Sequence, residues 1–209
     1  MVQNLPVVFI VDDELAVRES LESLVLSAGW QPRLFASAQE FLDHPRSASA
    51  SCLILDIGIP GLDGLQLQER IASQRMDLPI IFLTGYKQVP MAVQAMKAGA
   101  VEFLTKPFNS AELLSAIRNA LERSHKTLGR EATLQSLRLS FASLSPRERQ
   151  VMGLVVTGQL NKQVGGELGI NEGTVKAHRG QVMRKMKAES LADLVNMAAS
   201  LREGAPTTA

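Results

Sequence analysis

Short apolar segments alternate with longer helix-forming stretches through the first 120 residues, and this alternation restricts the folds open to the chain. Each apolar segment has the length of one buried strand, and the stretch after it carries apolar residues at helical spacing. Strands that alternate with helices form a parallel sheet covered by helices on both faces. The predicted strands are 6–11, 31–35, 52–55, 79–83 and 101–104, and the predicted helices are 15–28, 38–44, 64–74, 89–98 and 110–123. We therefore expect a five-stranded, doubly wound α/β domain.

The charge of the chain changes sign near Arg123. The residues up to that point hold 10 basic and 14 acidic side chains, a formal net charge of −4, whereas residues 124–209 hold 12 and 7, a net charge of +5. Such asymmetry indicates an acidic module joined to one that binds a polyanion. The single cysteine, Cys52, excludes a disulfide framework and a Cys-rich zinc site.

The sequence contains no segment expected to enter a membrane. No apolar stretch approaches the roughly 20 residues that cross a bilayer, and the N-terminus lacks the basic start of a signal peptide. We expect a cytoplasmic protein without a membrane partner.

Beyond residue 123 the sequence predicts helices only. Residues 123–141 are polar with an apolar stripe at helical spacing, which indicates a helical linker that continues the preceding helix. Gly129 is a candidate hinge in this linker, although a tolerated glycine is the simpler interpretation. Four further helices are predicted from their expected N-terminal caps, which are Ser145 followed by Pro146 and Glu148, then Asn161, Asn171 and Ser190.

Acidic residues follow two of the predicted strands. Asp12 and Asp13 come directly after the first strand, and Asp56 ends the third. The carboxyl ends of parallel strands meet at one edge, where these acids would repel one another unless a cation such as Mg²⁺ joins them. Thr84 ends the fourth strand and Lys106 follows the fifth. A carboxylate beside a divalent cation, a hydroxyl and an ammonium can receive a phosphoryl group, because aspartate is a nucleophile in aspartyl-phosphate chemistry.

Each of these residues taken alone has a simpler interpretation. An aspartate at a strand end is often only the N-cap of the next helix, and a lysine before a proline is usually a solvated loop charge. Coincidence is a poor explanation for the set, because a chemically matched residue falls at each of four strand ends. We therefore interpret the set as one site.

Four motifs here resemble those of the receiver domain of bacterial two-component response regulators. They are Val11-Asp12-Asp13-Glu14, Leu55-Asp56 followed by Pro60-Gly61, Leu83-Thr84-Gly85, and Leu104-Thr105-Lys106-Pro107-Phe108. The resemblance covers about residues 5–122 and implies a flavodoxin-like fold. It also implies that Asp56 accepts a phosphoryl group from a histidine kinase.

The same resemblance implies roles for the neighbouring residues. Mg²⁺ would be bound by Asp13, by Asp56 and by the backbone carbonyl of Gly58, with Asp12 acting partly through water. The phosphoryl group would be hydrogen-bonded by Thr84 and ion-paired with Lys106. Phe103 would be the aromatic switch residue, and the peptide between Lys106 and Pro107 would be cis.

Residues 161–187 have the pattern of a helix-turn-helix. Gly169 can end the first helix in a left-handed conformation and Asn171 can cap the second, which carries five basic residues and one acidic residue over 171–187. A helical projection places alanine and glycine on its outer face with basic side chains around them. Such a face can approach a major groove while Lys and Arg neutralise phosphates. The candidate DNA contacts are Lys162, Thr174, Lys176, Ala177, Gly180, Arg184 and Lys185.

Simpler interpretations exist in this helix as well. Charge alone would fit a solvated basic helix equally well, and the preceding helix and turn favour DNA binding. His178 is interpreted as a structural histidine rather than a metal ligand. Arg179 remains either a phosphate contact or a member of an internal ion pair.

The C-terminal region resembles the LuxR-type, four-helix DNA-binding domain over about residues 142–202. The motifs are Leu144-Ser145-Pro146-Arg147-Glu148, Leu168-Gly169-Ile170, Thr174-Val175-Lys176-x-His178-Arg179 and Met183-Arg184-Lys185-Met186. The family commonly has alanine where this chain has Gly165. A glycine inside a helix costs roughly 1 kcal/mol relative to alanine, so we expect the first helix of the motif to be less stable than usual.

Together the two resemblances indicate a response regulator of the FixJ/NarL class, closest to FixJ-like regulators on Gly85-x-x-x-Val89-Pro90-Met91-Ala92-Val93 and Val182–Met186. We expect a receiver at 5–122, a helical linker at 123–141 and an all-α DNA-binding domain at 142–205. The expected function is phosphorylation-dependent control of transcription, with a histidine kinase and double-stranded promoter DNA as partners. The protein is not expected to be a dedicated enzyme, although its phosphoryl group could be lost by self-dephosphorylation.

Phosphorylation is expected to convert a monomer into a homodimer through the surface from Val89 to Leu104. The apolar residues predicted to form that surface are Val89, Met91, Val93, Ala95 and Ala98. Burial of the same stripe within the fourth helix of the receiver is the simpler interpretation of part of it.

Two other functions are compatible with part of this pattern. One is a Mg²⁺-dependent aspartyl phosphatase of the haloacid dehalogenase type, which needs a second acid two residues after the nucleophile, where this chain has Gly58. The other is a DNA-binding regulator whose receiver acts without phosphorylation. The complete set of Asp12, Asp13, Asp56, Thr84 and Lys106 favours phosphorylation over both.

Overall fold

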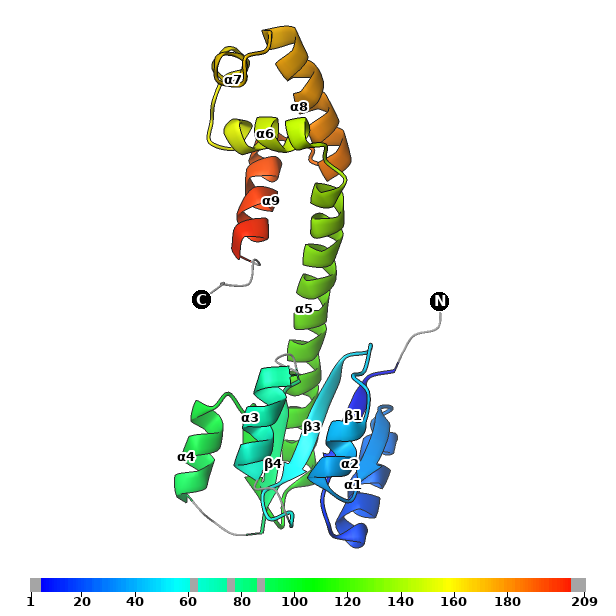
Figure 1. Ribbon diagram of the computed structural model, residues 1–209. Coiled ribbons are helices and arrows are strands. Elements are labelled where there is room, and N and C mark those ends of the chain that lie inside the picture. The colour runs from blue at the N-terminus through cyan, green and yellow to red at the C-terminus, as the bar shows by residue number, and fades with distance from the viewer. Residues whose placement is uncertain (1–4, 61–63, 75–77, 86–88, 204–209) are drawn as a thin grey trace. The chain divides into compact units, whose positions relative to one another are not determined.

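The computed structural model describes residues 5–60, 64–74, 78–85 and 89–203, and it divides into two compact units at Gly129. The first unit is built on a parallel sheet of five strands in the order β2-β1-β3-β4-β5 (Figure 1). The three inner strands are buried along their whole length, as expected where helices cover both faces. The strands are β1 (Val7–Val11), β2 (Gln31–Phe35), β3 (Ser51–Asp56), β4 (Ile80–Thr84) and β5 (Glu102–Thr105).

Successive side chains along each strand point to opposite faces of the sheet, and each face has its own core. On one face Phe9 and Leu53 pack with α2, α3 and α4. On the other Ile10 and Ile54 pack with α1 and the start of α5. The helices are α1 (Leu15–Ser27), α2 (Ala38–Asp43), α3 (Gly64–Gln74), α4 (Val89–Lys97) and α5 (Ser110–Ala142).

The doubly wound fold predicted from the sequence is confirmed, with boundaries shifted by a residue or two. The strands β3 and β4 extend to Asp56 and Thr84, so both polar residues belong to the ends of strands. Helix α5 continues from the first unit into the second and includes the residues of the predicted linker, with Gly129 inside it. Among the described helices, none is long and apolar enough to cross a membrane.

The second unit contains the end of α5 and four further helices around one core. These are α6 (Pro146–Val155), α7 (Asn161–Leu168), α8 (Glu172–Met186) and α9 (Leu191–Glu203). Each of these four helices contributes to the core, which includes Val151, Val164, Val182 and Leu194. Leu144, between α5 and α6, is also part of it, and Leu137 and Phe141 of α5 pack against it. The all-α architecture expected here is therefore confirmed.

The helix ends explain where the chain turns in this unit. Ser145 and Glu148 form the predicted capping box, the Asn171 side chain accepts a hydrogen bond from the Thr174 amide, and Ser190 caps α9 through the Asp193 amide. The prediction for Asn161 is wrong, because Asn161 is the first residue inside α7 and Leu160 precedes it.

Gly165 has a steric role that its low helix propensity does not reveal. A Cβ at this position would lie 2.7 Å from the carbonyl oxygen of Ile170, far inside ordinary contact distance. The missing side chain lets the turn at Gly169, whose φ is 66°, fold back onto α7. A Cβ at neighbouring Gly166 would meet nothing within 4 Å, so only the second glycine is dispensable for packing.

Candidate metal centre and nucleic-acid interface

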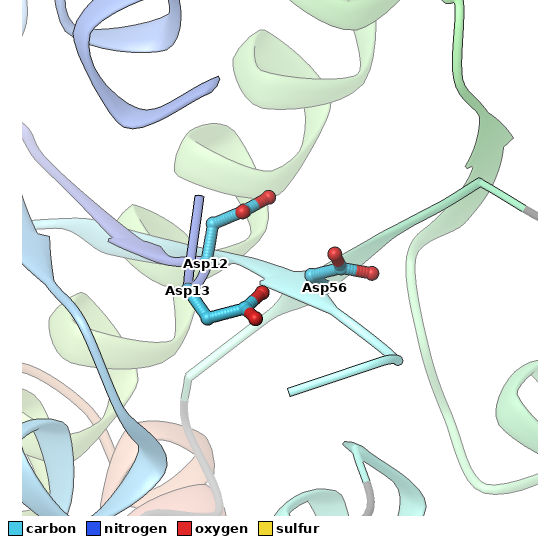
Figure 2. Close-up of side chains that lie close together, drawn as sticks. All are labelled: Asp12, Asp13 and Asp56. Atoms are coloured by element: carbon cyan, nitrogen blue, oxygen red, sulfur yellow. The ribbon is translucent and has the colours of Figure 1, made fainter. Parts of the chain in front are cut away.

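Three carboxylates meet at the carboxyl edge of the sheet (Figure 2). One oxygen from each of Asp12, Asp13 and Asp56 lies within 4.8 Å of the others. Asp12 and Asp13 directly follow β1, and Asp56 ends the adjacent strand β3. Asp12 and Asp56 are buried, whereas Asp13 is exposed. The cluster is therefore open to solvent on the Asp13 side.

The backbone and one cation hold these carboxylates in place. Asp12 accepts a hydrogen bond from the Glu14 amide at 2.9 Å, and Asp56 accepts one from the Gly58 amide at 3.1 Å. The Lys106 ammonium lies 2.7 Å from Asp12 Oδ2 and 2.9 Å from Asp56 Oδ2. A single lysine thus pairs with acids from two strands.

The electrostatics of Lys106 follow from this position. Burial favours the neutral amine and so acts to lower the pKa of Lys106. The hydrogen bonds and negative charges of Asp12 and Asp56 outweigh that effect, and the pKa of the ammonium is raised above its usual value. The lysine is therefore held in its charged form.

The chain around Lys106 fixes where its side chain begins. The peptide between Lys106 and Pro107 is cis, as the resemblance implied. The Lys106 amide donates to the carbonyl oxygen of Thr84 at 2.7 Å, which joins the end of β5 to the end of β4. Thr84 is buried, and half-buried Phe103 lies on β5 with its ring 6.4 Å from that of Phe82.

The donor set fits a hard divalent cation. Carboxylate oxygens are the preferred ligands of Mg²⁺, which binds through few protein groups and keeps several waters. Gly58 leaves space beside Asp56, since even an added Cβ would stay 3.9 Å from Asp56 Oδ1. The exposed Asp13 carboxylate and this open space suit a partly hydrated ion.

Sequence reasoning missed one residue of this site. Arg18, in the first turns of α1, donates from Nη1 to the backbone carbonyl oxygen of Asp12 at 2.5 Å. It fixes the backbone at the first acid of the cluster. Arg18 and Asp12 are six residues apart, a separation with no helical or strand periodicity that would have linked them.

The outer face predicted for α8 is confirmed as a surface. Val175, Val182 and Met186 are buried in the core. The exposed residues are Lys176, Ala177, Gly180 and Arg184, and Lys162 is exposed on α7. Small residues flanked by cations therefore form an accessible strip.

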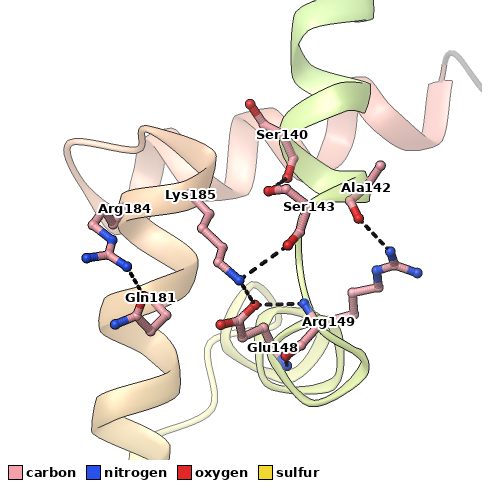
Figure 3. A network of polar contacts seen from close by, with 9 residues as sticks. Ser140, Ala142, Ser143, Glu148, Arg149, Gln181, Arg184 and Lys185 are labelled. Carbon is pink, nitrogen blue, oxygen red and sulfur yellow. Dashed lines mark hydrogen bonds and ion pairs between the residues drawn. The ribbon is translucent and has the colours of Figure 1, made fainter.

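Three other residues of α8 have partners inside the unit. The Thr174 hydroxyl donates to the Asn171 side chain at 3.1 Å. Arg179 donates to Asn161 Oδ1 at 3.2 Å, so it is held by an amide rather than by the internal ion pair considered above. Lys185 does not belong to the outer strip, because its ammonium contacts Glu148 and Ser143 (Figure 3).

The predicted apolar surface on α4 is only partly correct. Val93 is 47% exposed, and Met96, which was not predicted, is 44% exposed. Ala98 is exposed, but Ala95 is fully buried in the core, so its assignment to a dimer surface is wrong. The side chains of Val89 and Met91 lie outside the described residues.

Comparisons with known proteins identify both units. Residues 8–118 match the family model described as the response regulator receiver domain, and residues 142–198 match the one described as bacterial regulatory proteins, luxR family.

Several relatives match along almost the whole chain. Nodulation protein W of Bradyrhizobium diazoefficiens is 48% identical over 93% of this chain and 86% of its own length. The transcriptional regulatory protein FixJ of the same species is 42% identical over 91% of this chain and 93% of its own length. Among solved structures, the response regulator StyR matches with a TM-score of 0.84 and 44% identity, covering 93% of this chain and 98% of its own.

Proposed function

The chain belongs to the two-component response regulators that join a receiver domain to a LuxR-type DNA-binding domain, and we propose that phosphorylation of Asp56 controls its binding to promoter DNA. The observation that carries the proposal is the ion-paired carboxylate of Asp56 at the end of β3, beside two further acids and one lysine. The proposed boundaries are 5–122 for the receiver, 123–141 for the linker and 142–205 for the DNA-binding domain.

The proposed chemistry is the transfer of a phosphoryl group from a histidine kinase. A carboxylate oxygen of Asp56 attacks phosphorus and forms an acyl phosphate. The bond from phosphorus to the imidazole nitrogen of the kinase phosphohistidine breaks, and that nitrogen afterwards takes up a proton. Asp13, Asp56 and the Gly58 carbonyl would hold Mg²⁺, with Asp12 acting through water. The ion would neutralise charge on the transferring oxygens.

The other residues of the site bind the product. Lys106 already lies beside Asp56, and it would ion-pair with the new phosphoryl oxygens. The Thr84 hydroxyl at the end of β4 would donate a hydrogen bond to the same group. Movement of Thr84 would let Phe103 turn inward and alter the α4–β5 surface. Two receivers would then associate through that surface.

The proposed DNA contacts lie on the outer face of α8, at its N-terminal end and on α7. Lys176 and Arg184 of α8 would bind phosphates or base edges, with Ala177 and Gly180 allowing close approach and Lys162 and Thr174 flanking them. A helix-turn-helix unit reads a short half-site, and a dimer reads two. Dimerisation would therefore couple phosphorylation to promoter affinity.

The phosphatase alternative lacks the group that it needs. Hydrolysis of an aspartyl phosphate by that mechanism uses an acid two residues after the nucleophile, and Gly58 carries no side chain. Any loss of the phosphoryl group would depend on water reaching Asp56 without such an acid. We therefore propose no dedicated enzymatic activity.

The test is DNase footprinting and gel-based detection of phosphoprotein with and without acetyl phosphate and Mg²⁺. The natural sequence should become labelled and protect a promoter site at lower protein concentration, whereas Asp56→Asn should do neither. Asp43→Asn, on the exposed end of α2, is the matched control and should behave like the natural sequence. Full labelling of Asp56→Asn would refute the assignment of the acceptor. Equal protection of the promoter site by Asp56→Asn and Asp43→Asn in the presence of acetyl phosphate would favour a receiver that acts without phosphorylation.

A further inference from the structure

The end of α5 is joined to α6 and α8 by a network of polar contacts that the function described above does not use (Figure 3). Its centre is Glu148 of α6, whose side chain is 8% exposed. Its other members come from the last residues of α5, from Ser143 just beyond it and from the C-terminal half of α8. All of these residues belong to the second unit.

Two cations satisfy the carbonyl groups at the end of α5. The last carbonyls of a helix have no partner within the helix, and its C-terminus carries a partial negative charge. Arg149 of α6 donates to the Ala142 carbonyl oxygen at 2.9 Å, and Lys185 of α8 donates to that of Ser143 at 3.2 Å. The guanidinium of Arg149 also lies over the ring of Phe141, 5.5 Å from its centre.

Lys185 also neutralises a buried carboxylate. Glu148 Oε2 accepts one hydrogen bond from the Ser145 amide at 2.7 Å and another from the Lys185 ammonium at 2.7 Å. A buried charge without its partner is strongly destabilising. Lys185 is therefore tied to two acceptors outside its own helix.

Two other cations of α8, Lys176 and Arg184, differ from Lys185 in this respect. Lys176 and Arg184 are exposed on the outer face, and the Arg184 guanidinium donates to the side-chain oxygen of Gln181 on the same helix. The Lys185 side chain is only 31% exposed. Its ammonium faces the junction between α5 and α6, on the flank of α8 rather than on its outer face (Figure 3).

We propose that Lys185 is a positioning residue, which fixes the direction of α8 against α6 and the end of α5 and makes no contact with DNA. The inference rests on the proposed DNA binding and refines it, since it removes Lys185 from the DNA contacts and makes the end of the linker helix part of the reading unit. Lys176 would bind DNA through its charge, whereas Lys185 would act only by holding α8 in its orientation.

Salt dependence separates these two roles. Each phosphate contact contributes about 0.9 to the slope of log affinity against log salt concentration. We compare Lys185→Met with Lys176→Met, which removes the same charge from the same helix. The measurement is fluorescence anisotropy on a duplex that contains the footprinted site, at a temperature where circular dichroism shows each variant folded. We expect the slope to fall by about 0.9 for each DNA-bound protomer of Lys176→Met, and to stay unchanged for Lys185→Met.

The affinity of Lys185→Met should fall by about tenfold, within the range for residues coupled through one network. Glu148→Gln keeps a side chain that can cap α6 but removes the charge that Lys185 pairs with. Glu148→Gln should therefore also lower the affinity for DNA. The double variant should bind DNA no more weakly than whichever single variant binds it less tightly, because both changes break the same contact. If Lys185→Met fails to fold, Lys185→Gln takes its place in every measurement.

Three results would overturn the proposal. A slope that falls by about 0.9 for each DNA-bound protomer of Lys185→Met would make Lys185 a phosphate contact. Additive effects of Lys185→Met and Glu148→Gln would show that the two residues act separately. If Lys185→Met is folded and less heat-stable but binds DNA as tightly as the unsubstituted protein, Lys185 has only a structural role. Failure of the natural sequence to bind any duplex would instead refute the proposed function.

Discussion

The ammonium of Lys106 lies 2.9 Å from an oxygen of Asp56 and is shared with Asp12, so one cation stabilises two buried acids from neighbouring strands. Phosphorylation of Asp56 would place additional negative charge at the same point. The stronger attraction to the phosphoryl group would then draw the lysine ammonium away from Asp12. In the proposed mechanism, phosphorylation would therefore remove the contact between Asp12, which follows β1, and Lys106, which follows β5.

Replacement of this lysine tests the link. Lys106→Ala should still bind Mg²⁺, because its carboxylate ligands remain, and should still be labelled by acetyl phosphate. Labelling should no longer increase DNA affinity, since the cation that responds to the phosphoryl group is gone. Lys126→Ala removes an exposed lysine and serves as the control. A normal gain in DNA affinity on labelling of Lys106→Ala would contradict this role.

A second prediction concerns the paired glycines of α7. Gly166→Ala should stabilise the second unit by about 0.5–1 kcal/mol, because alanine has the higher helix propensity and meets open space. Gly165→Ala should destabilise it, because its Cβ would lie 2.7 Å from the Ile170 carbonyl oxygen. Amide hydrogen-exchange protection in α7 and α8 measures both changes. Equal stabilisation by Gly165→Ala and Gly166→Ala would show that the turn at Gly169 and Ile170 shifts without loss of stability.

The site around Lys106 and the glycines of α7 differ in how well the sequence predicts them. The residues at strand ends were predictable, because parallel pairing brings Asp12, Asp56 and Thr84 to one edge whatever the details of packing. The role of Gly165 was not, since it depends on how closely the chain turns back five residues later. Lys185 was placed among the candidate DNA contacts because it is a basic residue of the second helix of the motif. Its partner Glu148 lies 37 residues away on another helix, so helical periodicity could not predict the contact.

The α4 surface shows a related limit. An apolar residue on a single helix can face either the core or solvent, and the sequence pattern of α4 holds both kinds. Ala95 packs under Gln68, whose side-chain amide donates to the Ala95 carbonyl oxygen at 3.2 Å. The packing of α4 against the sheet and α3 decides which of its apolar residues remain exposed.

The third prediction concerns pH. The hydrogen bond from Lys185, with that from the Ser145 amide, holds the pKa of Glu148 below its usual value. A lowered folded-state pKa stabilises the fold above the ordinary pKa of glutamate, about 4.3, and this contribution disappears as the pH falls through the lowered value. From about pH 5 downward, the natural sequence should therefore lose more hydrogen-exchange protection in α6 and α8 than Glu148→Gln loses. Parallel losses in the two proteins would show that Glu148 is not the titrating group.

The last prediction concerns association through α4. Val93 and Met96 are three residues apart on one helical face, and both are large exposed apolar side chains. With beryllofluoride and Mg²⁺ as a phosphoryl mimic, the natural sequence should form a dimer in analytical ultracentrifugation. Val93→Glu and Met96→Glu should each keep it monomeric, because a carboxylate would be buried without a partner in the interface.

Leu26→Glu changes a side chain that is 56% exposed on α1 and should leave the dimer intact. Dimers of equal strength in Met96→Glu and in the natural sequence would place the interface elsewhere. A natural sequence that stays monomeric with the mimic would remove association from the mechanism. Phosphorylation would then have to act within one chain, through the freedom of the DNA-binding domain alone.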